Sequence, residues 1–161
     1  MKFPVLNAVL GLALVASFAV AQEPQTATEP AATTTSSVSN SQATVYFYRY
    51  KQFVGSALSP SVYCDESELA RMDNGKFFVA KLVTGKHVFH SNDKQAGIEV
   101  DVKGGQEYYI RVEIAPGMMK GHGRLILVAP EQGSYEIKKL KQLDRDKVKD
   151  SERVVAEVAA N

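Results

Sequence analysis

The sequence predicts an all-β protein: an antiparallel β-sandwich of about seven to eight strands, with a disordered N-terminal linker and a short C-terminal helix. Three observations lead to this prediction. Short segments are rich in β-branched and aromatic residues, many of them alternate apolar with polar side chains, and turn-forming residues separate them. Regularly spaced short strands of this kind are typical of an antiparallel sandwich or barrel.

The N-terminus has the pattern of a secretory signal peptide. Lys2 precedes an apolar run over residues 5–20, and Ala19 and Ala21 are the small residues that a signal peptidase reads before Gln22. We expect a signal peptide over residues 1–21. No second long apolar run follows, so we expect an exported protein, periplasmic or extracellular, without a transmembrane segment.

Residues 22–43 are dominated by Thr, Ser, Ala, Gln, Glu and Pro, which bury too little apolar surface to order a chain. We interpret them as a disordered linker. Removal of Lys2 with the signal peptide would leave 18 basic against 18 acidic residues, and this neutral balance argues against nucleic-acid binding. The lone cysteine, Cys64, excludes an internal disulfide, so the fold must depend on a packed core.

A β-sandwich domain is expected over residues 44–143, with its strands separated by turns such as "DNG", "TG" and "KGG". The segment over 124–129 is apolar on both faces, which indicates a central strand or a strand covered by the C-terminal segment. The predicted strands cover residues 44–50, 61–65, 76–82, 86–91, 97–102, 107–114, 124–129 and, less clearly, 135–140.

The C-terminal segment, residues 144–161, changes to a helical period. Asp144 can cap a helix, and Val148, Ser151, Val155 and Val158 fall on one narrow stripe. The stripe holds no large side chain, which favours a frayed or loosely docked helix over a membrane-binding one.

The segments "TVYFYRYKQFVGSALSPSVYCDESELARMDNGKFFVAKLVTGKHVF", "GQEYYIRVEI", "KGHGRLILVAPEQG" and "YEIKKLK" resemble a family of small exported bacterial proteins, often lipoproteins, classed as a domain of unknown function. The stretch around "VYCDESELARMDNGKFF" is also similar to PEGA-type and prealbumin-like modules. The resemblance implies a β-sandwich without an attached catalytic activity. Many relatives carry a cysteine for lipidation at the cleavage site, where this chain has Ala21 and Gln22, so a lipid anchor is not expected.

The histidine, cysteine and carboxylate side chains do not form a recognisable catalytic or metal-binding motif. We therefore predict no catalytic residues, no metal ligands and no cofactor. His87 and His90 are three apart on a predicted strand and should point to opposite faces, which prevents joint chelation. His87 should share a face with Phe89 as a hydrogen-bonded histidine. Cys64 is expected to be a buried, inert thiol, and the carboxylates of Asp65, Glu66 and Glu68 are interpreted as solvated charges in a turn.

The loop "IAPGMMKGHGR" is the first candidate contact surface. Met118 and Met119 offer adaptable apolar contacts, while Lys120, His122 and Arg124 supply donors for an anion. The alternative is a hairpin connection without a binding role.

Tyr46, Tyr48 and Tyr50 form the second candidate, an aromatic stripe on one face of the first strand that could stack on a sugar or a peptide. The alternative is a half-buried row with its hydroxyl groups in water.

Three function classes follow. The first is a non-catalytic extracytoplasmic binding or accessory module, with an envelope protein or a glycan as partner. The second is a structural spacer domain. The third is a metal-dependent enzyme or a metal-binding protein.

Overall fold

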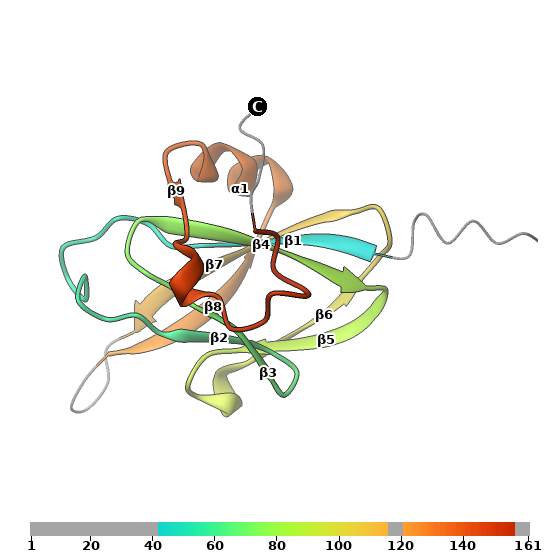
Figure 1. The fold of residues 1–161 in the computed structure, drawn as a ribbon, viewed down its shortest axis with the longest axis horizontal. Coiled ribbons are helices and arrows are strands. Elements are labelled where there is room, and N and C mark those ends of the chain that lie inside the picture. The colour runs from blue at the N-terminus through green and yellow to red at the C-terminus, as the bar shows by residue number, and fades with distance from the viewer. Residues whose placement is uncertain (1–41, 116–120, 157–161) are drawn as a thin grey trace, which may run out of the picture. The chain divides into compact units, whose positions relative to one another are not determined.

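The computed structural model describes residues 42–115 and 121–156, all within one compact unit, Ser36–Asn161. The predicted signal peptide and most of the linker lie outside the described residues. The strands form a five-stranded sheet, ordered β8-β7-β1-β4-β9, and a four-stranded sheet, ordered β3-β2-β5-β6 (Figure 1). The elements are β1 Gln42–Tyr48, β2 Ser61–Cys64, β3 Ser67–Arg71, β4 Lys76–Val83, β5 Gly85–His90, β6 Ile98–Val102, β7 Glu107–Ala115, β8 His122–Val128, α1 Pro130–Ile137 and β9 Lys141–Gln142, with short 3-10 turns at Lys94–Ala96 and Arg145–Lys147.

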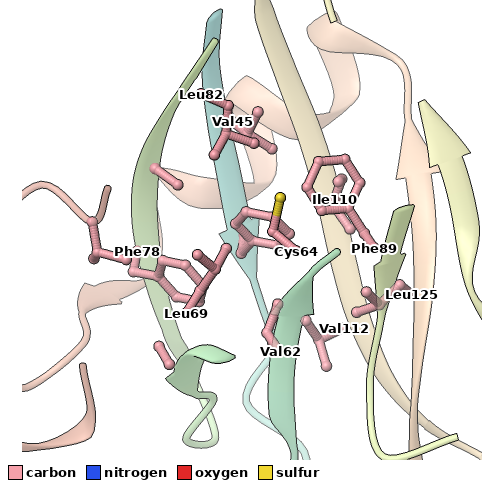
Figure 2. Packing of buried hydrophobic residues seen from close by; sticks show 14 of the residues in the cluster. Val45, Val62, Cys64, Leu69, Phe78, Leu82, Phe89, Ile110, Val112 and Leu125 are labelled. Carbon is pink, nitrogen blue, oxygen red and sulfur yellow. The ribbon is translucent and has the colours of Figure 1, made fainter. Parts of the chain in front are cut away.

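The core lies between the two sheets, which confirms the predicted β-sandwich. Val45 and Phe47 point inward from β1, and Phe47 stacks on Phe78 of the same sheet and meets Phe89 of the other sheet edge-on. Figure 2 shows side chains from both sheets converging on this layer, with Cys64 among them. The alternation along β6 and β7 places Val100, Val102, Ile110 and Val112 on this inner side, whereas Tyr109 lies in a second cluster with Tyr48.

Two strand pairings are parallel, which the antiparallel prediction did not include. β1 pairs antiparallel with β4 on one side and parallel with β7 on the other, and β4 pairs parallel with the short β9. The chain leaves β4 for the second sheet, forms β5 and β6 there, and returns to place β7 along the free side of β1.

The segment after Asp65 is a strand, β3, and not only a charged turn. Glu68 lies on this strand, while Leu69 and Ala70 are fully buried in the core. In the sequence these two apolar residues directly follow an acidic cluster, so the pattern indicated a charged turn and not a strand.

The prediction of a strand over 135–140 was wrong, because Tyr135 to Ile137 belong to α1. Pro130 occupies the first turn of this helix, where its fixed φ angle and missing N–H are both tolerated. α1 packs on the outer face of the five-stranded sheet, where Ile137 and Leu140 join a cluster around Tyr48 and Tyr109.

The structure has an α-helix near the C-terminus, α1, but it precedes the segment 144–161 in which the helix was predicted, and the described part of that segment contains no α-helix. Val148 and Val154 form isolated bridges with Ala70 and Ala80, and both pack against the core. These two valines lie at single bridge positions on either side of a turn, in which the Val154 N–H donates to the Asp150 carbonyl oxygen. Val158 lies outside the described residues.

The β8 strand is at the edge of its sheet, so the prediction of a central position was wrong. On its outer side Ile126 packs in the cluster that includes Ile137 and Leu140, so α1 and the turn after it, and not residues 144–161, cover this strand. Among the described residues, no helix is both long and apolar enough to cross a membrane.

Candidate functional site

The loop between β1 and β2 is held in place by a buried cation. The Arg49 side chain is fully buried and donates hydrogen bonds to the carbonyl oxygens of Gly55 (2.7 Å) and Leu58 (2.5 Å), with a longer contact to Met72 (3.5 Å). Burial lowers the pKa of Arg49, and the charge of Asp73 partly offsets this effect. Such charge-assisted bonds fix the path of the loop, so its tip has a defined position.

Two large apolar side chains stand at the tip of this loop. Phe53 is 95% exposed and Val54 is 81% exposed, while the backbone around them is closed by a turn in which Ser56 donates to the Phe53 carbonyl oxygen. Gly55 has a φ of +74°, which glycine adopts without strain. Adjacent exposed apolar residues on a fixed loop are typical of a contact surface.

A groove of about 480 Å³ lies beside this loop. Leu58, Pro60 and Ile114 supply apolar surface, and Arg71, Asn92 and His122 supply polar groups. At Gly123 a side chain would collide with Pro60 and Ser91, so a glycine is required for the wall of the groove to pack this closely.

The predicted contact loop is only partly described. Met118, Met119 and Lys120 lie outside the described residues. His122 is half-buried and lines the groove, and Arg124 is exposed on β8. The β1–β2 loop that carries Phe53 is called the Phe53 loop below. Ile114 and Gly121, on either side of residues 116–120, lie against Gly55 and Leu58 of this loop. The structure therefore brings part of the first predicted surface together with the Phe53 loop.

The second predicted surface, the aromatic stripe, is not open. Tyr48 is fully buried, and its hydroxyl group donates to Glu136 of α1 at 2.6 Å. Tyr46 is half-buried and stacks on Tyr109 with ring centroids 4.8 Å apart, and Tyr50 is half-buried against Tyr48. The expectation of an exposed stripe was wrong for Tyr48, because α1, which the sequence pattern did not predict, covers this face.

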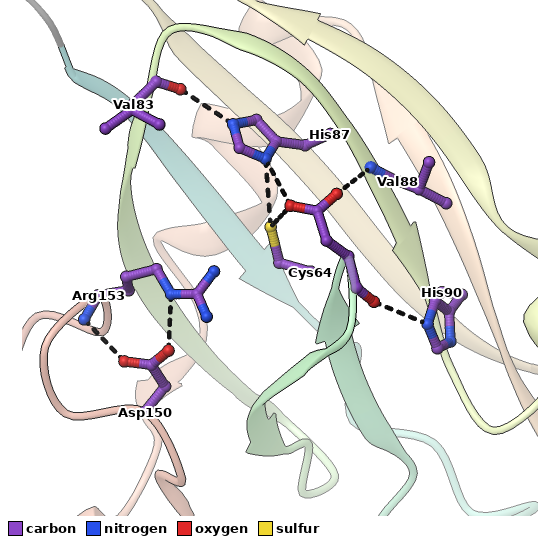
Figure 3. A network of polar contacts seen from close by, with 8 residues as sticks. Cys64, Val83, His87, Val88, His90, Asp150 and Arg153 are labelled. Atoms are coloured by element: carbon purple, nitrogen blue, oxygen red, sulfur yellow. Dashed lines mark hydrogen bonds and ion pairs between the residues drawn. The ribbon is translucent and has the colours of Figure 1, made fainter.

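The two histidines on β5 point to opposite faces, as predicted. His87 lies beside Phe89 and Cys64, whereas His90 is buried and stacks on the Tyr63 ring at 4.8 Å. Figure 3 shows His87 next to Cys64 and His90 away from this pair, and the His90 Nε2 lies 3.1 Å from the Asp65 carbonyl oxygen.

Cys64 is fully buried, as predicted. Burial raises the pKa of its thiol to about 12, and the nearby Asp65 carboxylate adds to the shift. The thiol therefore carries its proton at neutral pH. The Cys64 thiol contacts both the neighbouring Asp65 and His87. The sequence pattern could not show the contact with His87, since it depends on the pairing of β5 with β2.

A family model described as "Protein of unknown function (DUF2846)" matches residues 39–123, more than half of the chain. The chain belongs to the DUF2846 family. A Haemophilus influenzae protein described as "Uncharacterized protein" is 28% identical over 98 residues, which span 60% of this chain and 58% of that relative. No solved structure matches the chain.

The DUF2846 match contains the β1–β2 loop and the groove beside it. It runs from just before β1 to Gly123, at the start of β8, and so includes Arg49, Phe53 and the described lining of the groove. α1 and the segment that follows it lie beyond the match. Sequence reasoning missed Phe53 and Val54, although a Phe-Val pair beside a glycine in a segment without strand alternation was an available signal.

Proposed function

We propose that this DUF2846 protein is a non-catalytic, exported binding module that docks a protein of the cell envelope through Phe53 and Val54. The observation that carries the proposal is the near-complete exposure of both side chains on a loop that a buried arginine holds in place. Leaving apolar surface in water is unfavourable, and burial against a partner recovers this free energy.

The adjacent groove extends this surface. A partner side chain that enters it would meet the apolar groups of Leu58 and Ile114 and the charge of Arg71. A partner with an apolar surface for Phe53 and a carboxylate for Arg71 matches the chemistry of this end of the molecule.

A protein partner is favoured over a glycan at the predicted aromatic stripe, because the three tyrosines of that stripe are not free to stack on a sugar. Tyr48 is buried, and Tyr46 and Tyr50 have their rings engaged with Tyr109 and Tyr48. Stacking on a sugar would need an open ring face.

The non-catalytic part of the proposal rests on Cys64. Its thiol is the strongest nucleophile that the described side chains offer, yet it is fully buried and protonated at neutral pH. The exported location rests on the signal-peptide pattern of residues 1–21, and the Ala21–Gln22 junction argues against lipid anchoring. A relationship of the sandwich to PEGA-like modules is part of the same proposal.

The Phe53→Ser/Val54→Ser double variant tests the proposal. Because both side chains are exposed, we expect the free energy of unfolding to change by less than about 0.5 kcal/mol. In pull-downs from envelope extracts on the immobilised protein, we expect recovery of the retained protein to fall at least about tenfold.

Val83→Ser is the matched control, since Val83 is 61% exposed and lies at the end of β4. It should leave recovery unchanged. Equal recovery with both variants would favour the structural spacer hypothesis.

A further inference from the structure

Three side chains of different chemistry converge where β2 turns into β3. The Cys64 sulfur, an Asp65 carboxylate oxygen and the His87 Nδ1 all lie within 4.8 Å of one another. Cys64 ends β2, Asp65 begins the turn to β3, and His87 lies on the neighbouring strand β5, so the pairing of β2 with β5 brings them together (Figure 3). We propose that these residues form a binding site for a zinc ion.

The distances match one face of a zinc tetrahedron. Usual zinc bond lengths at tetrahedral angles place sulfur about 3.6 Å from nitrogen, sulfur about 3.5 Å from oxygen, and nitrogen about 3.3 Å from oxygen. The structure has 3.6 Å from the Cys64 Sγ to the His87 Nδ1, 3.5 Å from Sγ to the Asp65 Oδ2, and 2.9 Å from Nδ1 to Oδ2. An opening of a few tenths of an ångström between His87 and Asp65 would complete the match.

The surrounding backbone already orients two of the ligands. The His87 Nε2 donates to the Val83 carbonyl oxygen at 3.0 Å, which directs Nδ1 toward Asp65 and Cys64. A metal bound at Nδ1 would replace the hydrogen that Nδ1 donates to the Asp65 carboxylate at 2.9 Å. The second carboxylate oxygen of Asp65 accepts a hydrogen bond of 2.9 Å from the Val88 N–H. Outer contacts of this kind hold ligands in zinc sites.

The backbone at Asp65 is also unusual. Its φ angle is +55°, in the left-handed region, which is uncommon for a residue other than glycine. Aspartate tolerates this region better than most residues, and the conformation turns the carboxylate back toward Cys64 and His87. A strained residue that points a ligand at two others agrees with a binding role.

Access and charge are compatible with a cation. The Asp65 side chain is 47% exposed, so an ion and a fourth, water ligand can reach the site past this carboxylate. Arg153 lies near the thiol but forms an ion pair of 2.6 Å with Asp150, which compensates its charge. A bound zinc ion would displace the thiol proton, as metals do when they bind cysteine.

The donor set indicates zinc rather than magnesium or calcium. Thiolate and imidazole are ligands of the softer transition metals, while the hard cations take oxygen ligands. The ion would join the β2–β3 turn to β5, so its expected role is to stabilise this end of the sandwich. The partner-binding surface begins at the other end of β2, beside Pro60, so the two proposals can fail independently.

Zinc titration of the purified full chain tests the site. We expect one zinc ion per chain and a higher melting temperature with zinc than with magnesium. Cobalt substitution should produce the sulfur-to-cobalt charge-transfer absorption of a thiolate ligand.

Asp65→Asn and His87→Gln are the test variants, and His122→Gln is the matched control histidine. Asp65→Asn tolerates the left-handed backbone and keeps an acceptor for the Val88 N–H, so it should fold. We expect zinc affinity to fall about 100-fold or more in both test variants, since even loss of an outer contact costs 10–100-fold. His122→Gln should bind like the unaltered protein.

The proposal is overturned if the unaltered protein binds zinc no more tightly than magnesium. It is equally overturned if cobalt gives no thiolate band, or if Asp65→Asn binds zinc as tightly as the His122→Gln control. Because Asp65→Asn alone is decisive, poor folding of the His87 variant leaves the test intact.

Discussion

Gly133 decides how closely α1 can lie on the five-stranded sheet, and its replacement by alanine should destabilise the protein. A Cβ atom at this position would lie 2.6 Å from the Tyr109 Cδ1 and closer still to the Tyr109 Cβ and Cγ. Real Cβ contacts under 3.0 Å essentially never occur. Tyr109 cannot rotate away, because the atoms in collision are at the base of its side chain and its ring stacks on Tyr46.

Two effects of opposite sign set the magnitude. Alanine in place of glycine in a helix interior contributes about 1 kcal/mol of stabilisation. Overpacking of a closely packed site costs about 1–3 kcal/mol, and a collision with three atoms at the base of a ring belongs at the upper end of that range. To relieve it, α1 must move away from β7 and weaken the 2.6 Å hydrogen bond from Tyr48 to Glu136. We therefore expect a net loss of about 2 kcal/mol.

Urea denaturation of the purified chain measures this loss. With a typical slope of about 2 kcal/mol per molar urea, the midpoint of Gly133→Ala should fall by about 1 M. Ser134→Ala is the matched control, because Ser134 is exposed and next to Gly133 on the same helix. The control should be neutral or slightly stabilised. If Gly133→Ala is as stable as the unaltered protein, α1 does not pack on Tyr109 as described.

Two further predictions concern Glu136 and Arg49. Burial raises the pKa of Glu136, but hydrogen bonds from Tyr48, Tyr50 and Gln132 and the charge of Arg111 outweigh it, so the net pKa lies below the ordinary value of 4.5. A carboxyl group with a depressed folded pKa contributes stability above its unfolded value and loses it as the pH falls through the folded value. Urea midpoints measured below about pH 4.5 should therefore fall less steeply in Glu136→Gln than in the unaltered protein, and parallel curves would refute this role. Arg49→Met keeps much of the buried volume but leaves the carbonyl groups of Gly55 and Leu58 without their donor, which should cost about 1–3 kcal/mol per unsatisfied group. Limited proteolysis should then cut residues 51–58 faster than in the Phe53→Ser/Val54→Ser variant, and an unchanged cleavage rate would show that Arg49 does not hold the loop.

The strands that carry a regular pattern were predictable from the sequence. β6 and β7 alternate strictly, and glycines with positive φ angles end the segments before β4 and β7. The sandwich follows from these local signals. The parallel pairing of β1 with β7 joins residues about sixty positions apart, and local periodicity carries no information on such a pairing.

Mixed signals explain the errors. In α1, Tyr135 and Ile137 have the residue types of a strand, while the decisive features are Pro130 at the start and Gly133 facing Tyr109. After Asp144, Val148 and Val154 follow a pattern that also fits a helix, but each forms a single bridge, with Ala70 and Ala80, on either side of a turn. Tertiary contacts override local preference in both segments.

The candidate sites were also predictable only in part, where local sequence composition was enough to indicate them. The composition of its loop indicated His122 as a candidate contact, and the structure places this half-buried residue in the lining of the groove, while a contact with a partner stays a prediction. Cys64, Asp65 and His87 were each considered alone and given separate roles, since only the pairing of β2 with β5 brings them together. Arg49 appears in the sequence as an ordinary strand residue, and its burial depends on the carbonyl groups of a loop that follows it.

Site-specific photo-crosslinking in cells tests the central claim, that this end of the sandwich docks an envelope protein. A photoreactive residue replaces Phe53 in one version of the chain and Val83 in another, so that two exposed apolar positions at different places are compared. The account predicts one dominant, saturable adduct from position 53 that is absent from position 83. No adduct at position 53, or the same adducts from both positions, would contradict it.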